Sequence, residues 1–141
     1  MNILDYMNNI STQIFARGEN IFKEGDPPDG TMYFIFQGLF AVTKKNPDGM
    51  VEVITELGPG DFFGELALLS RRPRSMTVTV ISSKARTGIL RQELLEKLAR
   101  VNADFLYVLL RSTVQKLHRA EERLLSVNEE IQEAERVLRG K

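Results

Sequence analysis

The sequence changes character at Leu90, and this change limits the folds open to the chain. From Ile14 to Leu90, short apolar runs alternate with turn-forming segments, whereas after Leu90 glycine does not recur until Gly140 and proline is absent. Short apolar runs separated by turns, without long helices between them, are typical of antiparallel β-strands. Asn46–Gly49 is a strong hairpin signal because its glycine permits a positive φ. We predict eight strands, near Ile14–Ala16, Ile21–Phe22, Met32–Phe36, Leu39–Thr43, Met50–Leu57, Phe62–Phe63, Met76–Ile81 and Ala85–Leu90.

Helical patterns flank these runs. Four apolar residues at helical spacing within residues 1–10 predict a short leading helix. Gln92–Arg100 fits one short helix, and Val101–Leu138 fits a second helix of about 57 Å. We therefore predict an α+β, mainly β fold. Residues 1–100 form an eight-stranded antiparallel β-roll, jelly-roll-like, with flanking helices, and residues 101–141 form a long C-terminal helix.

Composition excludes several functional classes. Basic and acidic residues number 19 each, which disfavours non-specific binding to nucleic acid. The chain has no cysteine, and its single histidine, His118, cannot form a site that needs two. No apolar run approaches the roughly 20 residues that span a bilayer, and the N-terminus lacks the features of a signal peptide. We expect a cytoplasmic protein that binds neither membrane nor DNA through this chain.

The segment Gly58–Val78, with the sequence GPGDFFGELALLSRRPRSMTV, carries the strongest chemical signal. We predict a strand that ends at Gly64, a one-turn helix that begins near Glu65, and a loop that returns at Met76. A glycine before a helix lets a ligand approach backbone N–H groups, which favour an anion. Arg74 can add a charge-assisted contact to phosphate, and Glu65 can accept hydrogen bonds from sugar hydroxyls. An anion site beside a hydroxyl site indicates a nucleotide.

FGELALLSRRPRSMTV resembles the phosphate-binding cassette of the cyclic nucleotide-binding domain family. Gly25-Asp26, Gly38 and Gly58-x-Gly60-Asp61 support this resemblance, which covers nearly the whole chain. The resemblance implies an eight-stranded β-roll in which Glu65 binds the ribose 2′-hydroxyl and Arg74 binds the cyclic phosphate. It also implies a phosphate shell completed at Gly64, by the amides of Leu66 and Ala67, and by Ser75 and Met76.

The identity of the base is less constrained. In some members of the family a Thr-Ser pair on the long helix contacts adenine, but here that position is Ala120-Glu121. Lys116, Glu121 and Arg123 are the candidates for base contacts instead. Ser75 fits either a phosphate contact or a contact to the 2-amino group of guanine. We expect cAMP as the ligand, with cGMP as the alternative, and no other cofactor.

Catalysis is not expected, because neither a cluster of metal ligands nor a nucleophile with its base is present. His118 fits a solvated helix residue, as Arg71 and Arg72 fit solvated loop residues. The acids that fall within turns fit local backbone bonding rather than catalysis. These turn-forming acids are Asp26, Asp29, Asp48 and Asp61.

The long helix carries an apolar residue at every seventh position, which predicts a coiled-coil homodimer. Leu110, Leu117, Leu124, Ile131 and Leu138 repeat in this way, and Thr113, Ala120, Val127 and Ala134 follow three residues later. The family precedent is a parallel pair. An antiparallel pair would instead match the basic residues of 111–119 with the acidic residues of 121–135.

Three functions fit these patterns. The first is a non-catalytic receptor that relays nucleotide binding through the long helix to a downstream protein partner. The second is a structural dimer with a degenerate pocket. The third is the sensor part of a longer DNA-binding regulator, because some relatives continue into a helix-turn-helix domain and this chain ends at Lys141.

Overall fold

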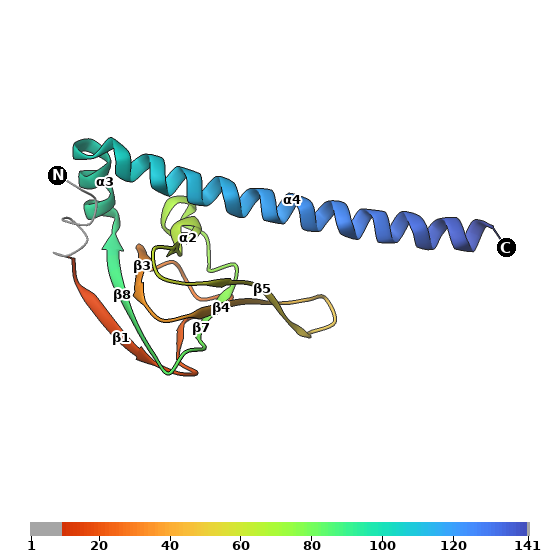
Figure 1. The fold of residues 1–141 in the computed structure, drawn as a ribbon, viewed down its shortest axis with the longest axis horizontal. Helices are drawn as coiled ribbons and strands as arrows, with labels where there is room; N and C mark the ends of the chain where they lie inside the picture. The colour runs from red at the N-terminus through yellow and green to blue at the C-terminus, as the bar shows by residue number, and fades with distance from the viewer. Residues whose placement is uncertain (1–9, 141) are drawn as a thin grey trace. The chain divides into compact units, whose positions relative to one another are not determined.

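The structure is a computed structural model that describes residues 10–140 (Figure 1). The chain divides into two compact units, residues 1–106 and residues 107–141. All eight predicted strands are present in the first unit. They are β1 (Thr12–Ala16), β2 (Asn20–Phe22), β3 (Thr31–Gln37), β4 (Phe40–Lys45), β5 (Val51–Leu57), β6 (Phe62–Phe63), β7 (Thr77–Val80) and β8 (Lys84–Arg91). The predicted helix spans residues 1–10, of which residues 1–9 lie outside the described part of the chain.

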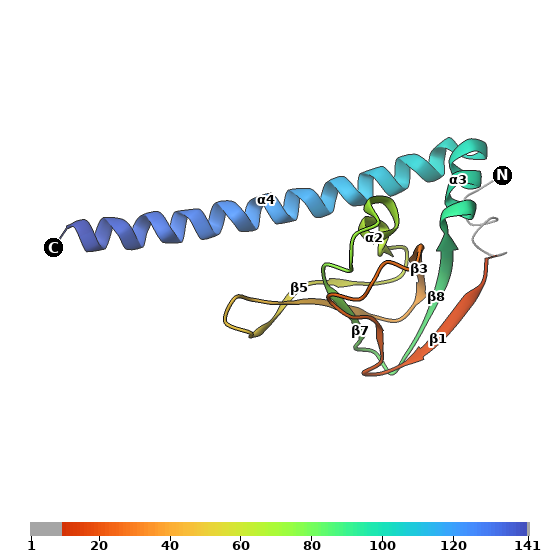
Figure 2. The same cartoon turned by 180° about the vertical axis from the view of Figure 1, so that it is seen from behind.

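The strands form two four-stranded sheets, with the orders β1-β8-β3-β6 and β2-β7-β4-β5. Figure 2 shows β1 and β8 of the first sheet side by side. Every neighbouring pair given a register is antiparallel, as predicted. The hairpin between β4 and β5 forms at the predicted turn, where Gly49 has a φ of 82°. The side-chain oxygen of Asn46 accepts hydrogen bonds from the N–H groups of Asp48 and Met50 and closes this turn.

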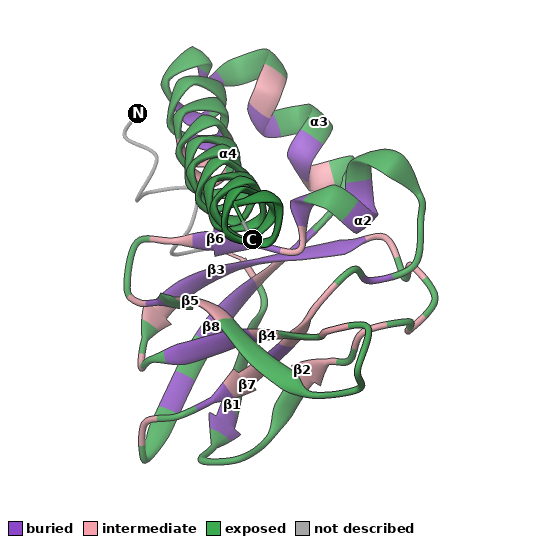
Figure 3. Ribbon diagram, turned by 90° about the vertical axis from the view of Figure 1, so that its right-hand side faces the viewer, coloured by how far each residue is buried: buried purple, intermediate pink, exposed green. Residues whose placement is uncertain are grey.

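The core lies between the two sheets, and both contribute apolar side chains to it. Phe40, Val78 and Val80 come from one sheet, and Ile35 and Ala85 come from the other. All five residues are at most 2% exposed. Buried residues accordingly line the strands of both layers (Figure 3). The core residues alternate along each strand because successive side chains point to opposite faces of a sheet.

β3 is buried on both of its faces, which explains its continuous apolar sequence. Tyr33 and Ile35 face the core, whereas Phe34 packs at a ring-centroid distance of 4.9 Å from Phe62. The ring of Phe62 in turn meets Phe105 edge-on at 5.8 Å. The helical end of the first unit therefore covers the outer side of this sheet.

Two helices follow β8. α3 (Gln92–Val101) buries Leu95 and Leu98, and α4 (Ala103–Arg139) is a continuous helix of 37 residues. The break between them lies at Asn102, which adopts an extended backbone and accepts a hydrogen bond from the N–H of Phe105 at 3.2 Å. Asparagine is a strong helix N-cap, so it starts α4 slightly after the predicted boundary at Val101. Among the described helices, none is long and apolar enough to cross a membrane.

Candidate functional site

The site is built around α2 (Glu65–Ser70), the short helix that follows β6. Gly64 precedes α2 with a φ of 84°, and Arg71 ends it with a φ of 56°. Both values lie in the left-handed region, which glycine enters freely and other residues enter at a cost. The segment thus forms the predicted sequence of strand, one-turn helix and returning loop.

Gly64 is required by its surroundings as well as by its backbone conformation. A Cβ atom placed on Gly64 would lie 2.9 Å from Nη1 of Arg74 and 3.4 Å from the ring of Phe22. The missing side chain therefore allows the Arg74 guanidinium to reach the backbone of this segment. Nη1 of Arg74 donates a hydrogen bond to the Gly64 carbonyl at 3.1 Å.

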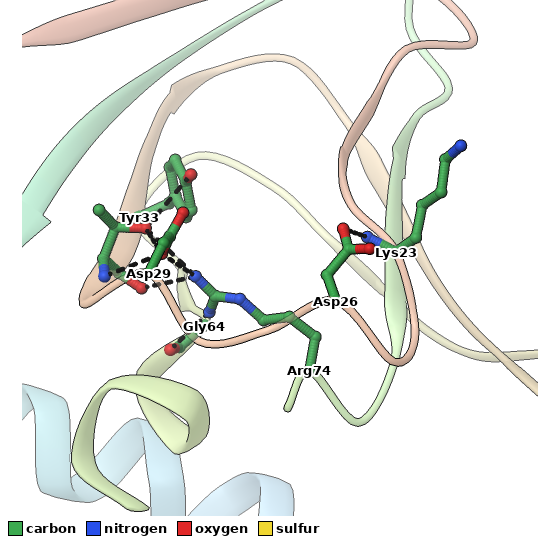
Figure 4. Close-up of polar contacts among 7 residues, drawn as sticks. Lys23, Asp26, Asp29, Tyr33, Gly64 and Arg74 are labelled. Carbon is green, nitrogen blue, oxygen red and sulfur yellow. Dashed lines mark hydrogen bonds and ion pairs between the residues drawn. The ribbon is translucent and has the colours of Figure 1, made fainter. Parts of the chain in front are cut away.

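Arg74 is buried, with only 4% of its surface exposed, and Figure 4 shows its guanidinium directed toward the start of β3. Nη2 donates to Oδ1 of Asp29 at 2.8 Å and to the Thr31 carbonyl at 3.0 Å. The guanidinium carbon also lies 4.1 Å from the centre of the Phe22 ring, which is a cation–π contact. These contacts hold the positive charge in one orientation.

The backbone of Arg74 is fixed as firmly as its side chain. Its carbonyl accepts a hydrogen bond from the N–H of Gly25, and its own N–H donates to the Asp26 carbonyl, both at 2.8 Å. The carboxylate of Asp26 in turn accepts a hydrogen bond from the N–H of Lys23 at 2.9 Å (Figure 4). The turn at residues 25–26 and the loop that carries Arg74 therefore form one hydrogen-bonded unit.

Asp29 plays a role that its sequence position did not reveal. It forms a turn as predicted, because its Oδ1 accepts a hydrogen bond from the N–H of Thr31 at 3.1 Å. It also forms an ion pair with Arg74, although the two lie 45 residues apart. Partial burial by itself would raise the pKa of Asp29, but the hydrogen bonds from Thr31 and the charge of Arg74 together lower it. Periodicity and spacing carry no signal for this pair.

The other predicted ligand-binding residues of the first unit lie close to Gly64 or Arg74 in the sequence. Glu65, in the first turn of α2, is 3% exposed. Ala67 is buried, Met76 is half-buried, and Leu66 and Ser75 are exposed. Arg71 and Arg72 are exposed, in agreement with their prediction as solvated residues. The fold thus brings the predicted Gly64 and Arg74 into contact and adds Asp29, Thr31 and Phe22, which the sequence interpretation missed.

The three candidates for base contacts lie on α4 in the second unit. Lys116 is half-buried, whereas Glu121 and Arg123 are exposed. His118 is exposed and lies 3.7 Å from Glu121 on the same helix. Within residues 10–140, no group of three or more His, Cys, Asp and Glu side chains could hold a metal ion.

A buried, oriented guanidinium beside a glycine-led turn suits a bound anion better than it suits bond-making chemistry. Fold and site together define a β-roll module with a buried guanidinium beside a short, glycine-led helix. A family model described as "Cyclic nucleotide-binding domain" matches residues 12–102, and the chain belongs to this family.

Two curated relatives illustrate the family. Over 98 residues the chain is 39% identical to the cAMP-dependent protein kinase type II regulatory subunit of Drosophila melanogaster, which covers 70% of this chain and 25% of the relative. Over 68 residues it is 38% identical to a CRP-like cAMP-activated global transcriptional regulator of Mycobacterium tuberculosis, which covers 48% of this chain and 30% of the relative. The chain thus matches between a quarter and a third of the length of these relatives.

Solved structures show the same fold. The Thermus thermophilus catabolite activator protein superposes with a TM-score of 0.78 at 21% sequence identity and covers 89% of this chain and 58% of that chain. The β-roll with a long C-terminal helix, predicted from the sequence, is therefore confirmed.

Proposed function

We propose that this chain is a non-catalytic receptor for a cyclic nucleotide, with cAMP as the principal ligand and cGMP as the alternative. The observation that carries the proposal is the buried guanidinium of Arg74, oriented by Gly64, Thr31 and Phe22 within a cyclic nucleotide-binding domain. The names of the two relatives, one a cAMP-dependent kinase subunit and one a cAMP-activated regulator, support cAMP.

Asp29 provides the carboxylate that pairs with the buried positive charge of Arg74. A buried cation without a partner is costly, and the Asp29 carboxylate neutralises Arg74 at 2.8 Å. The side chain of Asp29 is 61% exposed, whereas that of Arg74 is 2% exposed. An arriving phosphodiester can therefore share Arg74 with Asp29 or displace it, because an exposed carboxylate returns to water at little cost.

Arg74 and Glu65 have distinct proposed roles. Arg74 binds the cyclic phosphate, while Gly64, Leu66, Ala67, Ser75 and Met76 complete the shell around it. Glu65 accepts hydrogen bonds from the ribose 2′-hydroxyl, since an ionised carboxylate is an acceptor only. Lys116, Glu121 and Arg123 remain the proposed base contacts and would decide between adenine and guanine.

Isothermal titration of nucleotide-free protein with cAMP and with cGMP tests the receptor. Arg74→Ala is expected to abolish binding, whereas Arg72→Ala, which removes the same charge from an exposed position in the same loop, is expected to leave it unchanged. No binding of either nucleotide to folded protein, or equal losses in the two variants, would contradict the proposal.

The role of Glu65 has a separate test that uses 2′-deoxy-cAMP. Wild-type protein is expected to bind the deoxy analogue more weakly than cAMP, because Glu65 loses its partner. In Glu65→Ala the two ligands are expected to bind equally. A preference for cAMP that survives this substitution would place the 2′-hydroxyl elsewhere.

We also propose that α4 pairs with a second copy of the chain and transmits nucleotide binding to a downstream protein partner. Leu117, Leu124 and Ile131 support this role, because they are between 51% and 65% exposed along one side of the helix. Transmission requires that the nucleotide bind two arrangements of the helix with different affinities. Sedimentation equilibrium with and without cAMP tests the pairing and its coupling to the ligand.

A further inference from the structure

The exposed apolar face of α4 consists of alternating large and small side chains. Leu117, Leu124 and Ile131 are 58%, 65% and 51% exposed, and the smaller residues between them are exposed as well. Contiguous apolar surface of this kind marks a site of association. We refer to these positions as the α4 seam, which comprises Leu117, Ala120, Leu124, Val127, Ile131 and Ala134.

We infer that two copies of α4 pair antiparallel through this seam, with the two-fold axis between residues 125 and 126. This inference rests on the helix pairing proposed above and specifies its direction and register. It departs from the parallel pair that the family precedent implies. Two independent features of the helix, side-chain volume and charge, support it.

The volumes of the seam residues favour an antiparallel pair. In a parallel pair each residue meets its own copy, so Leu124 faces Leu124 and Ala134 faces Ala134. A pair of facing leucines holds the two helix axes further apart than a pair of facing alanines can fill. A parallel pair would therefore leave gaps at Ala120 and Ala134. In the antiparallel pair Leu124 faces Val127, Leu117 faces Ala134 and Ile131 faces Ala120. Every layer then joins one large and one smaller side chain, so the axes keep a nearly constant separation.

The charges beside the seam favour the same arrangement. Arg123 and Glu130 flank the seam on one side, and Glu121 and Asn128 flank it on the other. In the antiparallel pair Arg123 of each copy lies opposite Glu130 of the other, and Glu121 lies opposite Asn128. Two attractive pairs form and no like charges meet.

A parallel pair lacks this complementarity. Glu130 would lie beside Glu135 of the other copy, and this repulsion would occur twice. Lys116 of one copy would attract Glu121 of the other in a parallel pair. This attraction acts near the start of the seam and leaves the repulsion between Glu130 and Glu135 near its end. Exposed charge pairs are individually weak, so they specify direction and register more than they stabilise.

Charge also fixes the register. If one helix of the antiparallel pair slides by seven residues so that the two-fold axis moves toward the start of α4, Arg123 of one copy lies opposite Arg123 of the other. Glu121 then also lies opposite Glu121. A shift of one heptad in the other direction places Glu130 opposite Glu130. Only the register with its axis between residues 125 and 126 avoids these like-charge contacts while it keeps all six seam positions paired.

Cysteine cross-linking tests the direction, and the natural chain is a suitable background because it contains no cysteine. Leu117→Cys and Ala134→Cys proteins, each oxidised alone, are expected to remain free of intermolecular disulfides. A mixture of the two is expected to form a disulfide-linked dimer, because these positions meet in the antiparallel pair. Self-linked dimers from either protein alone would overturn the inference in favour of a parallel pair.

A distance measurement provides a second test that leaves the seam intact. In Arg139→Cys protein carrying a spin label, the two labels of a dimer are expected about 40 Å apart, since each residue adds about 1.5 Å along the helix. In a parallel pair they would lie within about 20 Å of each other. A predominant short distance would overturn the inference.

A charge reversal separates the two arrangements by the sign of its effect. Glu130→Arg places a second positive charge beside Arg123 in the antiparallel pair, and dimer dissociation is expected to become several-fold easier. In a parallel pair the same change removes the repulsion from Glu135 and would tighten the dimer. Glu129→Arg, on the outer face of the helix, carries the same charge change and is expected to have little effect. Tighter dimers for Glu130→Arg in sedimentation equilibrium would overturn the inference.

The outcomes also separate this inference from the receptor function. A monomer at every concentration tested would overturn both the direction and the proposed pairing, yet nucleotide titration would still decide the receptor function independently. A dimer with parallel distances would overturn the direction alone.

Discussion

Replacement of Gly64 by alanine tests whether the close approach of Arg74 to the backbone stabilises the fold. The change has two costs, one conformational and one steric. The left-handed φ of 84° at Gly64 costs an L-residue about 1–2 kcal/mol. In addition, the new Cβ would lie 2.9 Å from Nη1 of Arg74, which donates to the Gly64 carbonyl.

The steric cost depends on whether the guanidinium can retreat. Its other end is held by Asp29 and Thr31, and its face lies on Phe22, so movement away from Gly64 strains several contacts together. Loss of a hydrogen bond from a charged group costs about 1.5–3 kcal/mol. We therefore expect Gly64→Ala to lower the free energy of unfolding by about 3–5 kcal/mol.

Gly60→Ala is the matched control. Gly60 has a φ of 92°, but a Cβ atom there would meet no heavy atom within 4 Å. Its substitution is expected to cost only the conformational part, about 1–2 kcal/mol. The difference between the two variants isolates the contact with Arg74.

Urea-induced unfolding of nucleotide-free protein measures both variants. Near-ultraviolet circular dichroism is the suitable signal, because Tyr33 stacks on Phe63 at 5.1 Å within the β-roll. Equal losses for Gly64→Ala and Gly60→Ala would refute the reasoning, since they would show that Arg74 moves aside without cost.

Three further changes test the buried hydroxyl of Thr87 and two contacts of Arg74. Among the described residues, the hydroxyl of Thr87 has no hydrogen-bond partner although the residue is 0% exposed. Thr87→Val is therefore expected to raise the unfolding midpoint in urea or leave it unchanged. A decrease in the free energy of unfolding above about 1 kcal/mol would contradict this expectation. The folded-state pKa of Asp29 lies below its ordinary value of 3.8. The ionised carboxylate therefore stabilises the folded state fully above about pH 4, and this stabilisation disappears as the pH falls through the folded-state pKa. The stability advantage of wild type over Asp29→Asn, measured by urea unfolding from pH 7 to pH 2, is thus expected to shrink below about pH 4, and a constant advantage would exclude an electrostatic origin. Phe22→Leu removes the aromatic face beneath Arg74 and is expected to weaken cAMP binding in isothermal titration, whereas unchanged affinity would show that the ring does not orient the guanidinium.

Much of the fold was predictable because its signals are local in sequence. Strand positions follow from alternating apolar residues between turn signals, and the turn at Asn46–Gly49 carries its own hydrogen-bonding side chain. The start of α4 at Asn102 is also a local signal, because asparagine is a common N-cap, but the interpretation of the sequence did not use it.

The site was predictable only where it is continuous in the chain. Gly64 and Arg74, which the structure joins by a hydrogen bond, lie within one segment, so their spacing predicts them together, whereas the role of Glu65 in the same segment stays a prediction. Asp29 and Phe22 reach Arg74 only through the pairing of distant strands and loops, and neither has a pattern that distinguishes it from an ordinary turn acid or core aromatic residue. Information of this kind exists only in the three-dimensional structure.

The small size of α2 has a consequence for the kinetics of hydrogen exchange. α2 spans six residues between two left-handed positions, so few backbone hydrogen bonds must break to open it, and the two sheets need not separate. Its amide protons should exchange through local fluctuations that low concentrations of urea do not accelerate, whereas those in the centre of β8 require a much larger opening. Exchange rates along residues 65–70 would therefore report on ligand occupancy without interference from global unfolding.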